Sequence, residues 1–372
     1  DMLGRQQIAN VSTAISELFK NAHDAYANHA EVDYFRTDNL LVVRDNGVGM
    51  TSDEFENRWL VLGTESKYVS QGKKAETYKP IGKPERAIMG EKGIGRLAIA
   101  LLGRQVLVLT RAERHGEMHA LVMCFINWQL FEISGLNLDE IEIPMKLIQG
   151  DRLPTAEDVE ELIGKLRESV VSLSSIYGEQ VFHKILDDLD DFQLDPQAMD
   201  EFLDGISLRN HGCGTHFYIA PANEGIAHEI ENEHQTGSKE FTKFLLGFSN
   251  SLFRESPPPP IETAFRYWLT DAFGENLIGG EFFTHEELDT ADHRISGQVD
   301  AFGQFQGNIR IYEEEIKGHV ISWKSGSGKP TDCGPFEIEF GYIAGNQRES
   351  KLPPDEWKRI IDKVDHFGGV YV

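Results

Sequence analysis

One short stretch near the start of the chain decides the fold: residues 17–25, which read ELFKNAHDA. Apolar residues recur at helical spacing from residue 3 to residue 26, so this stretch is predicted to lie on one amphipathic helix. Glu17, Asn21 and Asp24 stand at positions i, i+4 and i+7, which places two carboxylates and one amide on the same helix face. A face of this kind can hold a hydrated cation.

Glycine-containing turns follow at three predicted boundaries between elements. Residues 45–50 read DNGVGM after a predicted strand, residues 90–95 read GEKGIG before a predicted helix, and residues 214–215 read GT before a predicted strand. Glycine lets the main chain approach a ligand closely, and the N–H groups at the start of a helix favour phosphate. The chain contains no G-x-x-x-x-G-K-[ST] sequence, which excludes the usual P-loop.

The length and composition limit the classes of protein to which this chain can belong. At 372 residues the chain is long enough for two domains with cores of their own. Its 61 acidic and 36 basic residues give a net charge of −25, so a general attraction to nucleic acid or to an anionic membrane is not expected. No apolar run approaches the roughly 20 residues that a membrane span needs.

Neither the cysteines nor the histidines are spaced like metal ligands. Three cysteines lie far apart in the sequence and match no disulfide framework, which favours a reducing, cytoplasmic location and structural roles. They are Cys124, Cys213 and Cys333. The histidines His211, His216 and His285 are also interpreted as structural. Because the chain starts at Asp1 and ends in a strand-like run, we expect a fragment of a longer protein.

The pattern along the chain predicts two domains. Residues 155–205 are helical in periodicity and acidic, and we interpret them as an insertion on a sheet domain. The four prolines at residues 257–260 are the predicted boundary. Beyond them the predicted elements are strands at 263–270, 294–302, 307–312 and 336–343 and a helix at 354–365.

Taken together, the motifs resemble the GHKL superfamily of ATPases, which includes gyrase B, heat-shock chaperones, histidine kinases and MutL. Residues 17–25 resemble its N-box, residues 45–50 and 90–95 its second and third boxes, and residues 214–215 its fourth. The resemblance covers residues 3–220 apart from the helical insertion, and within the superfamily it is nearest to heat-shock-chaperone-like and MORC-like bacterial proteins.

The resemblance implies an α+β fold with two parts. Residues 1–255 would form a Bergerat-type α/β sandwich that binds ATP, with the helical insertion at about 155–205. Residues 261–372 would form an α/β transducer-like domain, truncated at its C-terminus, that sends a lysine or arginine to the γ-phosphate. Arg348 and Lys351 are candidates for that cation.

The resemblance also implies roles for the first two boxes. Glu17 would be the catalytic general base, Asn21 the ligand of Mg²⁺, and Asp45 the acceptor for the adenine amine. A surface glutamate at position 17 and a plain Asp-Asn-Gly turn at 45 are the alternatives. Asp24 would either touch the site or support it. Gly47, Gly49 and Met50 would pack against the base.

The later boxes would contact the phosphates and the base. The third box would be part of a lid, with Gly90, Lys92, Gly93, Ile94 and Gly95 at the nucleotide. Lys67, in a segment that resembles the family's phosphate-proximal loop, would also pair with phosphate; for both lysines a solvated surface charge is the alternative. Thr215 would hydrogen-bond Asp45 or its water, unless it is an ordinary strand residue.

The function implied by this resemblance is an Mg²⁺-dependent ATPase that acts as a conformational switch. ATP binding would close the lid and an N-terminal homodimer and so drive a protein or nucleic-acid partner, with a DNA-management or defence role as one option. The alternatives are a catalytic domain of the histidine-kinase type and a nucleotide-binding scaffold without hydrolysis.

Overall fold

The structure is a computed structural model. It describes residues 10–60, 95–132, 142–172, 179–237, 239–246, 261–279, 285–322 and 334–368, with short pieces at 68–69, 73–74, 78–80, 82–83, 86, 88–89, 174, 283 and 329–331. The chain divides into two compact units, each described here by itself. The first is Asp1–Ser249 with Pro259–Gly279, and the second is Asn250–Pro258 with Gly280–Val372.

The first unit is built on an eight-stranded mixed sheet with the order β12-β11-β1-β2-β10-β5-β8-β9. Only the pair β1–β11 is parallel among these neighbours. The strands are β1 (His29–Phe35), β2 (Leu40–Asp45), β5 (Gln105–Arg111), β8 (Leu121–Asn127), β9 (Met145–Ile148), β10 (Gly214–Ile219), β11 (Glu262–Thr270) and β12 (Phe273–Asn276). Small hairpins outside the sheet are β3 (Tyr68–Val69) with β4 (Lys73–Lys74), and β6 (Glu113–Arg114) with β7 (Glu117–Met118).

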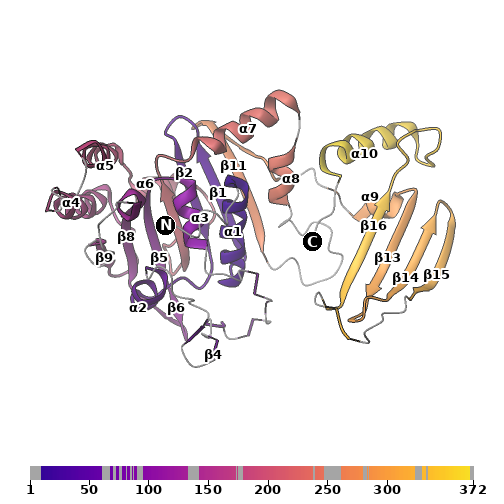
Figure 1. The fold of residues 1–372 in the computed structure, drawn as a ribbon, viewed down its shortest axis with the longest axis horizontal. Helices are drawn as coiled ribbons and strands as arrows, with labels where there is room; N and C mark the ends of the chain where they lie inside the picture. Colours follow the sequence, from indigo (N-terminus) through magenta and orange to yellow (C-terminus); the bar gives the residue numbers. More distant parts are fainter. Residues whose placement is uncertain are drawn as a thin grey trace. The chain divides into compact units, whose positions relative to one another are not determined.

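Helices α1 (Val11–Asp24) and α3 (Gly95–Leu102) pack together on one face of this sheet (Figure 1). The helix α1 begins at the cap Asn10, whose Oδ1 accepts the N–H of Thr13 at 2.9 Å. Ala14, Ile15 and Phe19 are fully buried, so the face that carries Glu17 and Asn21 is turned away from the core. Helices α7 (Glu224–Thr236) and α8 (Glu240–Leu246) pack on α1.

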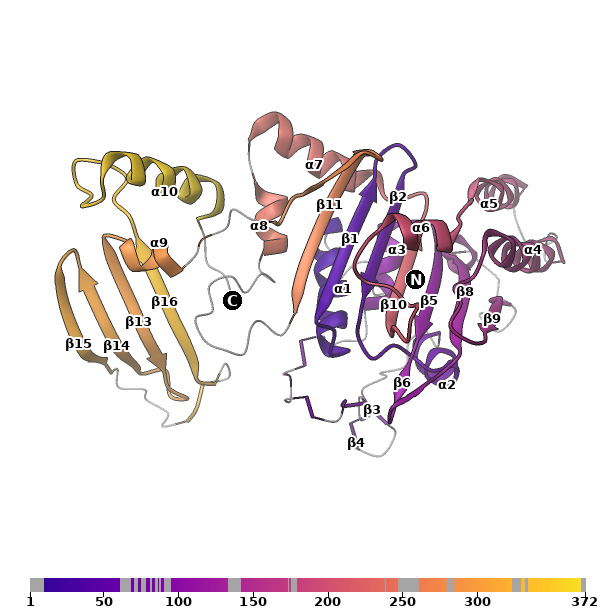
Figure 2. The same ribbon diagram turned by 180° about the vertical axis from the view of Figure 1, so that it is seen from behind.

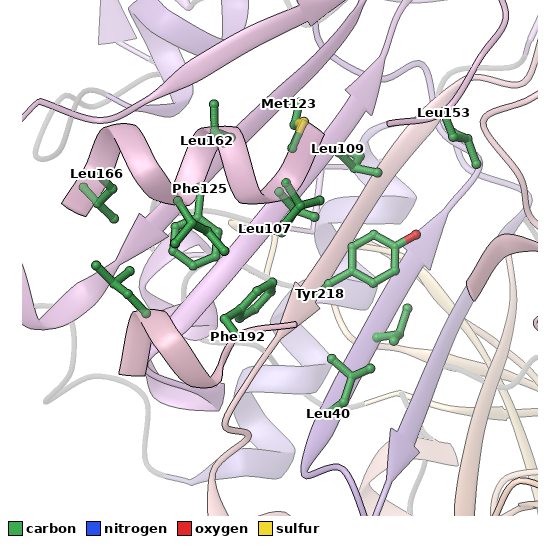
Figure 3. Close-up of a cluster of buried hydrophobic side chains, with 14 of the residues drawn as sticks. Leu40, Leu107, Leu109, Met123, Phe125, Leu153, Leu162, Leu166, Phe192 and Tyr218 are labelled. Carbon is green, nitrogen blue, oxygen red and sulfur yellow. The ribbon is translucent and has the colours of Figure 1, made fainter. Parts of the chain in front are cut away.

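The opposite face of the sheet is covered by the helices of the predicted insertion, α4 (Ala156–Ser172), α5 (Glu179–Asp191) and α6 (Pro196–Phe202). Leu162 and Leu166 of α4 pack over Leu107 and Phe125 in the buried cluster shown in Figure 3. Since side chains alternate along a strand, the neighbours of Leu107 in β5 point to the other face, toward α1 and α3. The inserted helices and the pair α1–α3 therefore lie on opposite faces of the sheet.

Two buried arginines join this helical layer to the sheet. The guanidinium of Arg44 donates to the carbonyls of Leu203 and Ile206 at 3.1 and 2.8 Å, and that of Arg111 donates to the carbonyl of Leu208 at 2.5 Å. Both side chains are almost fully buried, at 1% and 2% exposure. A buried charge needs hydrogen-bond acceptors of this kind. These hydrogen bonds connect the end of α6 and the residues after it to strands β2 and β5.

The structure differs from the sequence predictions in several elements. The sequence of residues 52–60 predicts one helix, with Thr51 or Ser52 as its cap. In the structure this segment begins as α2 (Ser52–Glu54) and continues as a π-helix, η2 (Phe55–Trp59). The sequence also predicts a strand at residues 118–125, paired with one at 106–111. In the structure residues 118–125 belong to two elements, β7 and β8, because the β6–β7 hairpin ends before the buried strand begins. The sequence predictions did not include the helix α7 or the strands β9, β12 and β15. A 3-10 helix, η3 (Trp128–Glu132), follows β8.

The second unit is a four-stranded antiparallel sheet with the order β15-β14-β13-β16. Its elements are α9 (His285–Thr290), β13 (His293–Val299), β14 (Phe305–Ile311), β15 (Glu314–Ile321), β16 (Phe336–Tyr342) and α10 (Pro354–Phe367). Glu287 of α9 pairs with Arg359 and Lys363 of α10 at 2.8 and 2.6 Å. Along β16 the alternate residues Phe336, Ile338, Phe340 and Tyr342 are exposed by 36–50%.

The predicted boundary at the prolines does not coincide with the division into compact units. The strand β11 pairs with β1 over seven residues, from His29 opposite Glu262 to Phe35 opposite Trp268. This pairing makes β11 and β12 part of the first sheet, and the second unit resumes at Gly280. The α+β class with a large sheet and a second α/β unit is confirmed. Among the described residues, no helix has the length and apolar character needed to cross a bilayer.

Candidate functional site

Asp45 is the last residue of β2 and lies directly opposite Thr215 of β10. Its side chain is half-buried, and its Oδ1 accepts the backbone N–H of Gly47 at 2.8 Å. Burial raises the pKa of the Asp45 carboxyl from 3.8 to about 6, although hydrogen bonds from the backbone N–H groups of Gly47 and Thr215 act to lower it. A carboxylate has about four acceptor positions, so two N–H donors leave room for a further donor.

The glycines beside Asp45 are required by the protein's own main chain. Gly49 has a φ of +58°, and a Cβ there would lie 1.9 Å from the carbonyl oxygen of Arg111. A Cβ on Gly47 would lie 2.8 Å from the carbonyl oxygen of Ala25. The loop therefore lies against both β5 and the end of α1, which only residues without a side chain permit.

Hydrogen bonds join this loop to the end of α1. The N–H of Val48 donates to the carbonyl of Ala25 at 2.8 Å, immediately after the helix ends at Asp24. Asn46 Oδ1 accepts the N–H groups of Asn28 and His29, both at 2.8 Å. Because the loop and the helix end are hydrogen-bonded neighbours, the first and second boxes lie together.

Thr110 is a member of the site that the sequence interpretation missed. Its fully buried Oγ1 lies 3.0 Å from Met50 N, 2.9 Å from Gly214 O and 3.0 Å from Thr215 Oγ1. The hydroxyl has one proton, which Gly214 O receives, while Met50 N–H can only donate. The hydroxyl of Thr215 must then donate to Thr110, so Thr215 Oγ1 has only lone pairs left for another partner.

The α1 residues of the site differ in their contacts. Glu17 is 15% exposed and accepts Lys20 Nζ at 2.7 Å. Asn21 is exposed, and among the described residues its side chain has no hydrogen-bond partner. Asp24 Oδ1 accepts the N–H of Met89 at 2.9 Å and lies 3.4 Å from His23 Nδ1. Asp24 thus contacts the chain just before the third box.

The remaining predicted residues are described only in part. Gly95 is the first residue of α3. Lys67, Gly90, Lys92, Gly93 and Ile94 lie outside the described residues. Thr110 had no signal of its own in the sequence, since only the register that places it opposite Thr215 shows its position.

The residues present fit an adenine nucleotide with a divalent cation. The Asp45 carboxylate and the Thr215 hydroxyl are acceptors that suit an amino group, while the amide of Asn21 and the carboxylate of Glu17 offer oxygen atoms from one helix. Mg²⁺ is commonly held by one or two protein oxygens together with phosphates and water. The described residues contain no group of three or more His, Cys, Asp or Glu side chains that could hold a metal ion.

Comparison with known proteins finds a family match for residues 9–155. Residues 9–155 match the family described as histidine kinase-, DNA gyrase B- and HSP90-like ATPases. This segment, called the GHKL segment below, is similar to the GHKL ATPases. The GHKL segment contains α1, the Asp45 loop, α3 and Thr110, whereas Thr215 lies beyond its end. The resemblance inferred from the boxes is confirmed.

A curated chaperone protein is similar to part of this chain. The chain is 32% identical over 117 residues to the chaperone protein HtpG of Shouchella clausii (strain KSM-K16). The match covers 29% of this chain and 17% of the chaperone, so it supports a heat-shock-chaperone-like GHKL domain.

The raised pKa of Asp45 predicts a pH dependence of stability in the nucleotide-free protein. Between pH 3.8 and about 6 the folded protein holds a proton that the unfolded chain has lost. The contribution of Asp45 to the free energy of unfolding therefore falls as pH rises through this window, by roughly 3 kcal/mol for a shift of about two pKa units. Urea unfolding measures the free energy of unfolding at pH 4 and at pH 7. Between these pH values the wild type should lose more of this free energy than Asp45→Asn does. Equal pH dependence in both proteins would contradict the prediction.

Proposed function

We propose that this protein binds ATP with Mg²⁺ and hydrolyses it, and that binding acts as a conformational switch. The observation that carries the proposal is the half-buried carboxylate of Asp45, which lies opposite Thr215 at the end of β2 in a GHKL segment. Such a pair of acceptors is suited to an exocyclic amine. Guanine presents a carbonyl oxygen at the corresponding position, and this oxygen would repel both acceptors.

Residues of α1 would bind Mg²⁺ and the attacking water at the triphosphate end of the nucleotide. The amide of Asn21, which has no hydrogen-bond partner among the described residues, would be a ligand of Mg²⁺, and this ion supplies charge neutralisation to the phosphates when bound. Glu17 would orient the attacking water and accept its proton. The ion pair with Lys20, at 2.7 Å, holds the Glu17 carboxylate in a defined position on α1.

The third box would contact the phosphates. Gly95 starts α3, an eight-residue helix packed on α1, and the positive end of its dipole attracts anions. Gly90, Gly93 and Ile94 would offer backbone N–H groups, and Lys92 and Lys67 would offer charges. In this proposal Asp24 supports the box through its hydrogen bond to Met89.

The switch would act on partners through the second unit, which we propose as a transducer-like domain. The exposed apolar residues of β16 support a contact of this unit with a partner, since such groups of side chains mark interaction sites. A homodimer in a reducing cytoplasm is part of the same proposal, and the described Cys124 and Cys213 are free thiols. The net charge of −25 gives no support to a DNA-directed role.

Calorimetry and a phosphate-release assay test the proposal together. ATP with Mg²⁺ should bind with a dissociation constant in the micromolar to millimolar range, GTP should bind at least about tenfold more weakly, and ATP should be turned over slowly. Heats that do not depend on the nucleotide base would contradict the assigned roles of Asp45 and Thr215. Binding without turnover would favour the scaffold alternative.

A further inference from the structure

The contacts of Arg114 point to a positioning residue for the loop that follows Asp45. Arg114 is in the β6–β7 hairpin, whose turn residues His115 and Gly116 both have positive φ, at 56° and 82°. This turn type suits a tight hairpin between two short strands. The hairpin lies next to α2 beyond the end of the main sheet (Figure 2).

The guanidinium of Arg114 binds the loop that follows Asp45. Nη1 donates to the carbonyl of Val48 at 2.7 Å, and Nη2 donates to the carbonyl of Gly49 at 2.9 Å. These carbonyls belong to the peptide units on either side of the Gly49 Cα, so the two hydrogen bonds stabilise its left-handed conformation. On the other side of the loop the next N–H, that of Met50, is held by Thr110. Arg114 and Thr110 therefore determine the path of the loop together.

The same cation binds the beginning of α2. Nη2 lies 2.5 Å from Glu54 Oε2, and this carboxylate also accepts the N–H of Thr51 in a capping box at the start of the helix. Burial acts to raise the pKa of Glu54, but the hydrogen bonds from Thr51 and Arg114 hold it below its usual value. Glu54 is thus ionised at neutral pH, and its hydrogen bonds with Arg114 are charge-assisted.

Tyr78 adds a contact from the segment between the second and third boxes. Its ring lies 4.5 Å from the Arg114 guanidinium carbon, and its hydroxyl accepts the N–H of His115 at 3.1 Å. Arg114 is only 12% exposed, so little water competes for these contacts. The flat guanidinium can stack on a ring while its edges donate in the plane, which a lysine ammonium cannot do.

We propose that Arg114 is a positioning residue for base recognition, holding the Asp45–Met50 loop in its nucleotide-binding form and joining Tyr78 to it. The inference rests on the proposed ATP site. It assigns Arg114 no contact with the nucleotide, so its effect passes through the backbone of Val48 and Gly49. Affinity and base preference should then depend on Arg114, whereas the rate of the chemical step should not.

The test compares Arg114→Ala and Arg114→Lys with wild type in nucleotide binding and turnover. Loss of several charge-assisted hydrogen bonds should raise the dissociation constant for ATP about tenfold in Arg114→Ala and reduce the preference for ATP over GTP. Turnover at saturating ATP should stay within about twofold of wild type, as expected for a residue that acts on binding alone. Arg114→Lys keeps the positive charge but loses the planar guanidinium. Its ATP affinity and base preference should lie between those of wild type and Arg114→Ala.

Arg209→Ala provides a matched control. Like Arg114, Arg209 binds carboxylate and carbonyl oxygens, but its partners Asp200, Glu201 and Gln197 lie in α6 of the inserted region. This variant should keep wild-type affinity and base preference. If Arg114→Ala shows wild-type ATP affinity and wild-type base preference, the inference is overturned. If the alanine variant does not fold, the same result in Arg114→Lys would overturn it. A wild-type protein that binds no ATP would instead refute the proposed function.

Discussion

Replacing Glu17 by alanine is expected to lower the rate of ATP hydrolysis by about 100-fold to 10,000-fold, the range that a positioned general base contributes. ATP affinity should change by less than about threefold, because a general base contributes to the transition state more than to the ground state. Single-turnover phosphate release and calorimetry measure the two quantities separately. Glu17→Gln should show the same loss, since it keeps the size of the side chain and removes its basicity.

The control for Glu17 is Glu160→Ala. Glu160 is an exposed carboxylate on α4, in the helical layer on the other face of the sheet. Its loss should leave hydrolysis at the wild-type rate. Equal turnover in wild type and Glu17→Ala would refute hydrolysis by this site and would leave a nucleotide-binding scaffold as the better description.

Replacing Asp45 by asparagine should weaken ATP binding by roughly 10-fold to 100-fold, the range for loss of a hydrogen bond to a charged group. The amide keeps one oxygen for the N–H of Gly47 but loses the charge and an acceptor position. Nucleotide-free Asp45→Asn should be at least as stable as wild type at pH 7, because the substitution removes an ionised carboxylate from a half-buried position. Weaker binding together with retained stability separates a ligand contact from a folding defect.

Asp53→Asn is the matched control for this substitution. Asp53 is an exposed aspartate in the first turn of α2, a short distance along the chain from the loop. Its neutralisation should leave ATP affinity unchanged. If Asp45→Asn binds ATP as tightly as wild type does, the adenine amine is recognised elsewhere and the assignment of Asp45 is wrong.

The features that could be predicted from the sequence are those encoded by neighbouring residues. The helical spacing of Ile15, Leu18 and Phe19 predicts α1 and the face that carries Glu17 and Asn21. The run of β-branched and apolar residues before Asp45 likewise predicts β2 and the turn that follows it. Both predictions agree with the structure because hydrophobic period and turn chemistry act over a few residues.

Predictions that depend on long-range pairing were incomplete. The polyproline run indicated a boundary, yet β11 beyond it pairs with β1, more than 230 residues earlier in the chain. The β6–β7 hairpin was not predicted from the sequence, and neither was the role of Arg114, because a single arginine between two predicted strands has no local sequence signature. Its partners Val48, Glu54 and Tyr78 come from three separate segments.

The sequence by itself determined the GHKL character of residues 9–155, the helix that carries Glu17 and Asn21, and the place of Asp45 at the end of a strand. Tertiary structure alone decided that Thr110 supports Thr215 and that inserted helices cover the reverse face of the sheet. The physical reason is that side-chain period and turn preference are local properties, whereas hydrogen-bond partners across a sheet depend on register between distant segments.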